Sequence, residues 1–117
     1  MAPPEAESLR AASLRGQGCG AGIVTGRVHV VSQPQQVLAR VGEIIACSTT
    51  DPSWTPVFPA CAGILTERGS VLGHAAVVAR EFGIPAIVAI PGLLEWIRDG
   101  DIVQIDGATG IVTLVSD

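Results

Sequence analysis

Apolar and polar residues alternate in three stretches of the chain, which is the pattern of strands with one face in a core. These stretches are residues 26–31 (GRVHVV), 101–106 (DIVQID) and 111–115 (IVTLV). The last two flank a glycine-rich segment, residues 107–110, and this arrangement favours a hairpin. Three shorter and almost wholly apolar runs predict buried strands, at residues 43–47, 62–65 and 85–89.

Short helical segments are predicted between these strands, at residues 34–41, 54–60, 74–81 and 93–98. Pro34 suits a first helical turn, and Pro56 and Pro59 keep the second helix short. Ser53 is the expected N-cap of that helix. About six strands with three or four short helices predict one mixed α/β domain.

The N-terminal segment follows a different pattern. Residues 1–15 lack an apolar period and predict a flexible lead-in, which leaves residues 16–117 as the domain. Acidic Glu5 and Glu7 stand where a secretory signal would carry positive charge. Glycines alternate at residues 16–22, but no lysine follows them, so an entry into a strand is favoured over a nucleotide loop.

Composition narrows the function classes. The 117 residues are 48% hydrophobic, enough for one core, and no apolar run reaches the length of a membrane span. The net charge is −4, and the seven basic residues are scattered arginines, which argues against nucleic acid. Cys19, Cys47 and Cys61 form no CxxC pair, so buried free thiols in a reducing cytoplasm are expected, with no metal site.

The stretch from Thr66 to Ala89 contains the strongest candidate chemistry. It is interpreted as a strand end, a glycine-rich turn, a short helix and the start of another strand. Gly69 and Gly73 bracket the turn, and His74 falls in the first turn of the helix. Free amide groups and the positive end of the helix dipole attract anions there. A histidine beside an anion site is suited to phosphate chemistry.

Polar residues gather where two of the buried strands end. Residues 48–51 (STTD) follow one strand, and residues 66–68 (TER) follow the next. Ligand sites of α/β folds collect at such strand ends, so we expect both clusters and His74 at one edge, with His74 exposed. His29, within a strand and without acidic or cysteine neighbours, is interpreted as a tolerated polar position.

The stretch that begins at Thr66 and contains His74 resembles the phosphohistidine motif of the swivelling, "mobile" domain of phosphoenolpyruvate-utilising enzymes. The matching segments are residues 66–69, 73–81 and 83–86, and the resemblance extends over about residues 16–115. The family includes pyruvate phosphate dikinase, phosphoenolpyruvate synthase, enzyme I of the sugar phosphotransferase system and rifampin phosphotransferase. Residues 50–56 with Leu72 are most similar to the rifampin phosphotransferase branch, which has phosphoenolpyruvate synthase-like relatives.

The resemblance implies a β/β/α swivelling domain that carries a phosphoryl group on His74. Such a domain accepts the group from an ATP-grasp domain, or from phosphoenolpyruvate, and passes it to a second substrate. It is part of a phosphotransferase and is not competent alone. ATP and Mg²⁺ are expected at the partner domain, and no cofactor is expected here. The partners implied are the ATP-grasp domain and an acceptor-substrate domain, in the same chain or in trans.

Supporting residues follow from the same resemblance. Thr55 matches a threonine that hydrogen-bonds the active histidine; its alternative is an ordinary hydroxyl at a helix start. Arg68 suits phosphoryl oxygens, and its alternative is a surface ion pair with Glu67 or Glu81. The candidate phosphate-binding set comprises Thr55, Thr66, Arg68, Gly69 and Gly73. Arg80 is interpreted as structural.

The chain differs from the family pattern at two positions. Ser70 replaces the second glycine of a Gly-Gly pair, and Gly73 replaces a serine, threonine or cysteine before the histidine. The lost hydroxyl predicts a slower phosphoacceptor. It also leaves open a non-catalytic interaction module that kept the fold. A hydrolase that uses His74 with Ser70 or Ser53 lacks any GxSxG elbow and is disfavoured.

Overall fold

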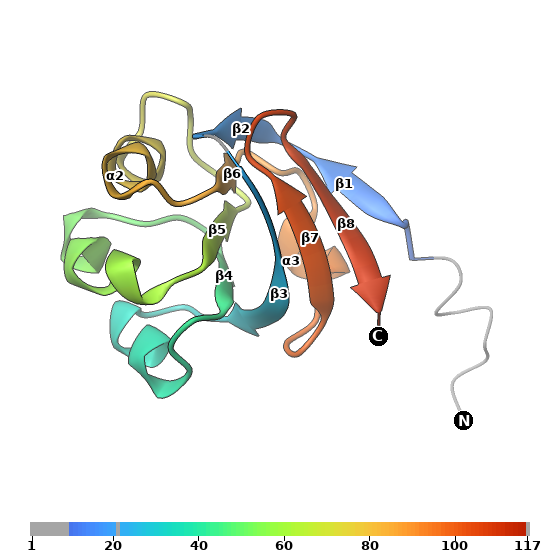
Figure 1. Cartoon of the computed structure of the whole chain (residues 1–117), viewed down its shortest axis with the longest axis horizontal. Coiled ribbons are helices and arrows are strands. Elements are labelled where there is room, and N and C mark those ends of the chain that lie inside the picture. Colours follow the sequence, from blue (N-terminus) through green and yellow to red (C-terminus); the bar gives the residue numbers. More distant parts are fainter. Residues whose placement is uncertain (1–9, 21, 117) are drawn as a thin grey trace.

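A computed structural model describes residues 10–20 and 22–116. Within these ranges the chain forms one eight-stranded sheet with short helices against it (Figure 1). The strands are β1 (Ser13–Arg15), β2 (Gln17–Cys19), β3 (Ile23–Val30), β4 (Ile44–Cys47), β5 (Gly63–Thr66), β6 (Ala86–Val88), β7 (Ile102–Asp106) and β8 (Ile111–Ser116). The helices are the 3₁₀ segments η1 (Pro34–Ala39) and η2 (Pro52–Ala60) and the α-helices α2 (His74–Phe82) and α3 (Leu93–Trp96). The mixed α/β class predicted from the sequence is confirmed.

The long strand β3 joins two differently built halves of the sheet (Figure 1). Residues 28–30 of β3 pair in parallel with β4, and β5 and β6 continue that direction; we call β4, β5 and β6 the parallel half. Residues 23–27 of β3 pair antiparallel with β7, which pairs with β8 and then β1; we call β1, β7 and β8 the antiparallel half. The short strand β2 pairs antiparallel with β6 at the other edge.

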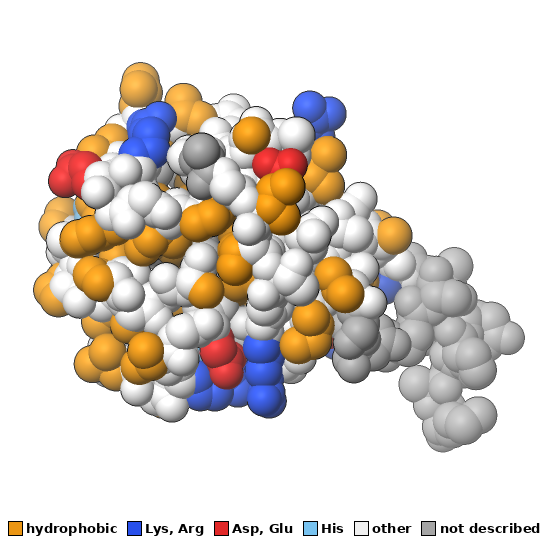
Figure 2. All heavy atoms as spheres, viewed as in Figure 1, with side chains coloured by type: hydrophobic (Ala, Val, Ile, Leu, Met, Phe, Trp, Pro, Cys, Tyr) orange, Lys and Arg blue, Asp and Glu red, His pale blue; other side chains and the backbone are white. Residues whose placement is uncertain are grey.

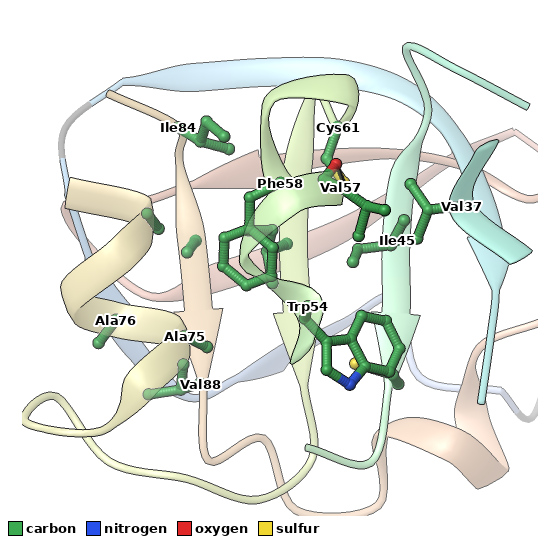
Figure 3. Close-up of a cluster of buried hydrophobic side chains, with 14 of the residues drawn as sticks. Val37, Ile45, Trp54, Val57, Phe58, Cys61, Ala75, Ala76, Ile84 and Val88 are labelled. Carbon is green, nitrogen blue, oxygen red and sulfur yellow. Dashed lines mark hydrogen bonds between the residues drawn. The ribbon is translucent and has the colours of Figure 1, made fainter. Parts of the chain in front are cut away.

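The parallel half is buried on both faces. Every residue of β4, β5 and β6 is buried, which explains why these segments are apolar runs rather than alternating patterns. On one face, Trp54 and Phe58 of η2 pack with the small residues Ala75 and Ala76 of α2 (Figure 3). The opposite face packs against α3 and β7 through a second cluster that includes Leu93, Trp96, Val103 and Ile105.

Two strands of the structure were not predicted from the sequence. Both β1 and β2 lie in or beside the glycine-rich N-terminal stretch, where the side-chain pattern is weak. Glycine is needed there because backbones approach closely: a Cβ at Gly16 would lie 2.5 Å from the carbonyl oxygen of Val88, and one at Gly18 would lie 2.3 Å from that of Gly107. The glycines therefore let strands pack closely. This agrees with the sequence prediction of an entry into a strand rather than a nucleotide loop.

Part of the segment predicted as a flexible lead-in belongs to the folded domain. Strand β1 pairs with β8, so residues 13–15 extend the sheet. The Arg10 guanidinium donates to the Asp101 carboxylate at 2.9 Å, and the Trp96 indole N–H donates to the Ala11 carbonyl at 2.7 Å. Residues 1–9, the rest of the predicted lead-in, lie outside the described residues. A strand of three residues is too short for the alternating pattern that marks longer strands to be recognised.

The predicted helices are present, with two corrections. The segments expected at 34–41 and 54–60 are 3₁₀ helices, η1 and η2, and η2 begins two residues earlier. Its N-cap is Asp51 rather than Ser53: the Asp51 carboxylate accepts the backbone N–H of Ser53 at 2.8 Å and the Ser53 hydroxyl at 2.5 Å. These two hydrogen bonds lower the pKa of Asp51. Helix α2 begins at His74, as predicted.

The surface carries few charges. On the face shown in Figure 2, basic and acidic side chains stand in small separate groups among uncharged and hydrophobic atoms, and they form no continuous basic strip. Among the helices that the structure describes, none has both the length and the apolar composition needed to cross a bilayer. The three cysteines are free and buried, as the sequence predicted.

Candidate functional site

The carboxyl ends of β4 and β5 meet the start of α2 at one edge of the sheet. The loops that leave the two strands stay paired, because Glu67 N donates to the Cys47 carbonyl at 3.1 Å and Arg68 N to the Ser48 carbonyl at 2.9 Å. A pocket of about 190 Å³ opens between these loops and the helix start. It is lined by Thr49, Thr50, Arg68, Gly69, Ser70, Gly73, His74, Ala75 and Val88. The predicted convergence of the strand-end clusters on His74 is confirmed.

His74 is held at both ring nitrogens. Thr50 Oγ1 lies 2.9 Å from Nδ1, and Thr55 Oγ1 lies 2.9 Å from Nε2. The edge of the ring also meets Phe58, with ring centroids 5.6 Å apart and planes at 61°. A neutral imidazole has one N–H and one lone pair, so one threonine accepts a hydrogen bond from the ring while the other donates to it. The ring is half-buried and fixed in orientation, which corrects the expectation of an exposed histidine.

The backbone around the ring is arranged to receive an anion. Gly73 is the N-cap of α2, with φ −81° and ψ 176° and no side chain to cap the helix. The amides of the first helical turn have no intrahelical acceptors, and the helix dipole adds partial positive charge at the same place. At Gly69, φ is 122°, a backbone conformation that favours glycine. The pocket is therefore electropositive at its helix end without any lysine.

The other predicted phosphate-binding residues divide into two groups. Arg68 is exposed at the pocket, and within the described part of the chain it forms no ion pair, so the alternative pairing with Glu67 or Glu81 is not seen. Thr66 is buried, and its hydroxyl donates to the Arg68 carbonyl at 2.6 Å. Thr66 thus shapes the loop rather than facing the pocket.

Two residues near the motif have structural roles. Glu67 accepts the backbone N–H of Leu94 at 2.9 Å and so ties the loop after β5 to α3. Arg80 donates to the carbonyl of Val71 and steadies the turn before His74. The sequence interpretation of Arg80 as a structural residue that bonds a neighbouring loop is confirmed.

Thr50 and Ser70 line the pocket, but neither was predicted from the sequence as a phosphate-binding residue. Thr50 belongs to the polar cluster predicted at the end of β4, but the pattern does not tell which of its hydroxyls reaches the histidine ring. Ser70 was noted as a departure from the family pattern and in the disfavoured hydrolase alternative. Both depend on the course of a loop, which side-chain periodicity does not report.

A larger cavity of about 530 Å³ lies beside this pocket and shares Thr49 with it. Its lining comes from the carboxyl ends of β3 and β4, from the start of η1 and from Asp51, Ser53 and Trp54. Cys47 also lines this cavity, but burial raises the pKa of its thiol to about 12, so the thiol stays protonated and is a poor nucleophile. In the described ranges no three His, Cys, Asp or Glu side chains cluster as metal ligands.

His29 occupies a different setting. It lies in β3, and its Nδ1 is buried without a hydrogen-bond partner in the described part of the chain. It lies within a strand rather than at the start of a helix, and it lines neither of the two pockets described above. Of the two histidines, His74 alone lies at a helix start with polar groups around it.

The fold and the site together define a small α/β domain that presents one oriented histidine at a helix N-terminus. Comparison with known proteins agrees with this class. The family model "PEP-utilising enzyme, mobile domain" matches residues 39–110. The chain therefore belongs to the family of mobile domains of phosphoenolpyruvate-utilising enzymes.

Relatives of known name are much longer than this chain. Rifampicin phosphotransferase of Bacillus subtilis (strain 168) is 35% identical over 108 residues, which is 92% of this chain and 12% of that protein. Phosphoenolpyruvate synthase of Aeropyrum pernix is 34% identical over 114 residues, 94% of this chain and 14% of that protein. The chain thus corresponds to one domain of large phosphotransferase-family proteins.

Solved structures give the same fold. An NMR structure of Enzyme I matches with a TM-score of 0.58 and 29% identity over 66% of this chain and 32% of that chain. Aconitase X of Thermococcus kodakaraensis matches with a TM-score of 0.66 over 91% of this chain and all of that chain. Its identity is 18%, so this second likeness concerns the fold alone.

Proposed function

We propose that this chain is a phosphoryl-carrier domain in which His74 accepts a phosphoryl group and passes it to a second substrate. The observation that carries the proposal is the ring of His74, fixed by Thr50 and Thr55 beside an electropositive pocket that contains Arg68. A histidine that serves only packing can also be hydrogen-bonded at both nitrogens, but it has no need of an anion pocket next to it. Family membership and phosphotransferase relatives support the same conclusion.

The chemistry follows from the geometry. The lone pair of one ring nitrogen forms the N–P bond, while the P–O bond to the donor's leaving group breaks and its electrons go with the leaving group. The other ring nitrogen keeps its N–H, which a threonine hydroxyl accepts. The helix N-terminus attracts the incoming phosphoryl anion. Phosphoryl transfer depends mainly on positioning and charge neutralisation, which the fixed ring and Arg68 supply.

In the second step the group leaves the histidine. An oxygen of the acceptor attacks phosphorus, the N–P electrons return to the ring, and the acceptor's proton goes to a base at the acceptor site. The pocket of about 190 Å³ accommodates a phosphoryl group rather than a nucleotide, so donor and acceptor are bound elsewhere. The domain therefore works only together with partner domains.

The proposed donor is an ATP-grasp domain that binds ATP and Mg²⁺, or phosphoenolpyruvate, and the proposed acceptor is a separate substrate domain. The relatives are about eight times longer than this chain, which leaves room for both partners in one polypeptide. We place the reaction in the cytoplasm, where ATP is abundant and the three buried thiols stay reduced.

Phosphoramidate, a small donor that transfers its phosphoryl group to imidazole nitrogen, tests the acceptor histidine without any partner. The chain is incubated with phosphoramidate, and the product is examined by intact mass and phosphorus NMR. We expect one phosphohistidine per molecule, absent in His74→Ala and retained in His29→Ala. Labelling of the parent at His29 alone, or at neither histidine, would overturn the proposal and favour the interaction module instead.

A further inference from the structure

Ser70 stands next to the space that the missing side chain of residue 73 would occupy. A Cβ built on Gly73 would lie 3.6 Å from the Ser70 hydroxyl oxygen and 3.3 Å from the Ser70 carbonyl oxygen. Gly73 and Ser70 both line the small pocket beside His74. The loop between β5 and α2, which reaches the start of the helix in Figure 1, thus brings a hydroxyl to the histidine from three residues earlier than the helix cap.

The turn fixes this hydroxyl and leaves its proton available. Gly73 N donates to the Ser70 carbonyl at 2.9 Å, which closes the turn. Leu72 N donates to Ser70 Oγ at 3.2 Å, so the oxygen is already held as an acceptor. Among the described residues the Ser70 hydroxyl meets no acceptor for its own hydrogen. A hydroxyl that is oriented by the backbone and still free to donate is suited to a phosphoryl oxygen.

The helix cap itself offers no side-chain donor. Gly73 provides no side-chain oxygen, and the two threonines bond the ring nitrogens until the N–P bond forms, when the one at the reacting nitrogen is released. Arg68 is the charged donor at the pocket, and it lies on the same β5–α2 loop as Ser70. Ser70 lies three residues before the cap, and in the described residues its hydroxyl has no other hydrogen-bond acceptor.

We infer that Ser70 donates a hydrogen bond to the phosphoryl group on His74, and so supplies the hydroxyl that the helix cap Gly73 lacks. This inference rests on the proposed function. The group's negative oxygens make the hydrogen bond charge-assisted, and its loss slows phosphorylation about tenfold. Ser70 therefore acts on the transferred group, and its hydroxyl oxygen also accepts the Leu72 N–H within the turn.

The test compares labelling rates by phosphoramidate in the parent and in five variants of the whole chain. Ser70→Ala should label His74 about tenfold more slowly than the parent, whereas Ser70→Thr, which keeps the hydroxyl, should stay close to the parent. The swap Ser70→Gly with Gly73→Ser should recover most of the rate, because it returns the hydroxyl from the neighbouring position. The matched control, Ser70→Gly with Gly73→Ala, adds a Cβ at residue 73 without an oxygen, and its labelling should stay slow.

The φ of Gly73 is −81°, a value that serine adopts, although a Cβ there would lie 3.3 Å from the Ser70 carbonyl oxygen, so the turn must give by a few tenths of an ångström. Urea unfolding of each variant confirms that labelling differences are not differences in folded fraction. Removal of an exposed hydroxyl far from the pocket, Ser13→Ala on β1, should leave the rate unchanged. Equal rates for the parent and Ser70→Ala would overturn this inference and leave the carrier function intact. Failure of the parent to label at all would instead overturn the proposed function.

Discussion

The two halves of the sheet are both built from strand-forming residues, but they differ in burial and in how their strands are connected. In the parallel half, every strand residue is buried and the loops leave β4 and β5 at one edge, beside the start of α2. In the antiparallel half, the strands alternate between buried and more exposed positions, and a tight hairpin joins β7 to β8. Parallel strands need crossover connections, and those connections bring polar residues from distant parts of the sequence together.

The two histidines sharpen this comparison. His74 belongs to a crossover of the parallel half and has threonine hydroxyls at both ring nitrogens. His29 belongs to the strand that joins the halves, and its buried Nδ1 has no partner in the described residues. Residue type alone therefore does not mark the site; the helix start and the surrounding hydroxyls do. The predictions that follow test whether chemistry and stability separate between the halves in this way.

The largest effect is expected from a substitution that creates a cavity beneath His74. Phe58 is fully buried and meets the histidine ring edge to face, so Phe58→Ala should lower the free energy of unfolding by about 3–5 kcal/mol. It should also slow labelling of the folded fraction, because the ring loses one of its walls. Urea unfolding and phosphoramidate labelling measure the two effects.

The matched control is a buried residue of the antiparallel half. Ile105→Ala in β7 should cost about 2–5 kcal/mol of stability and leave the labelling rate of folded molecules unchanged. If both cavities slowed labelling to the same degree, the distinction between a site-bearing half and a scaffold half would not hold.

The next effect concerns the N-terminal strand. The side chains of Arg10 and Asp101 are 7% and 6% exposed, so Arg10→Met leaves a buried carboxylate without its cation. The backbone N–H of Arg98 still donates to Asp101 at 2.9 Å, and we expect a loss of about 3 kcal/mol in the free energy of unfolding. The labelling rate should not change, since the pair lies outside the pocket. A loss well below 1 kcal/mol would show that this ion pair does not secure β1.

The smallest effects are expected at the threonines. Thr50→Val and Thr55→Val each remove one hydrogen bond to the ring of His74 and keep a side chain of similar size. We expect each to lower the free energy of unfolding by about 0.5–1.5 kcal/mol. Because the threonine that accepts from the ring N–H and the threonine that donates to the ring lone pair support the same tautomer of His74, the two variants should shift the tautomer in the same direction. Nitrogen NMR of the imidazole reads the tautomer directly. Shifts in opposite directions would contradict the assignment of one accepting and one donating threonine.

The sequence predicts the parts of this molecule whose signals are local and periodic. The alternating stretches became β3, β7 and β8, the apolar runs became the parallel half, and α2 begins at His74 as the glycine turn indicated. Strands β1 and β2 have three residues each, too few for a period, and their pairing depends on glycines that let backbones approach. Those two strands could be placed only by tertiary contacts.

The site was predictable in its centre and less so around it. His74 is found from the helix start, and Thr55, expected from the family resemblance, lies 2.9 Å from its Nε2. Thr66 was expected to face the phosphate, but its hydroxyl bonds the Arg68 carbonyl instead. The positions of Thr50 and Ser70 follow from the course of two loops, and such loops are fixed by individual hydrogen bonds that leave no periodic trace in the sequence.

The most direct test of the carrier function uses the biological type of donor. The chain is mixed with the ATP-grasp domain that we propose as its donor, Mg²⁺ and ATP labelled in the phosphates, and bound phosphate is followed in acid and in base. We expect one acid-labile, base-stable phosphate per chain, lost in His74→Ala and kept in His29→Ala. Labelling that survives His74→Ala, or a chain that this donor leaves unlabelled, would contradict the assignment of His74 as the phosphoryl acceptor.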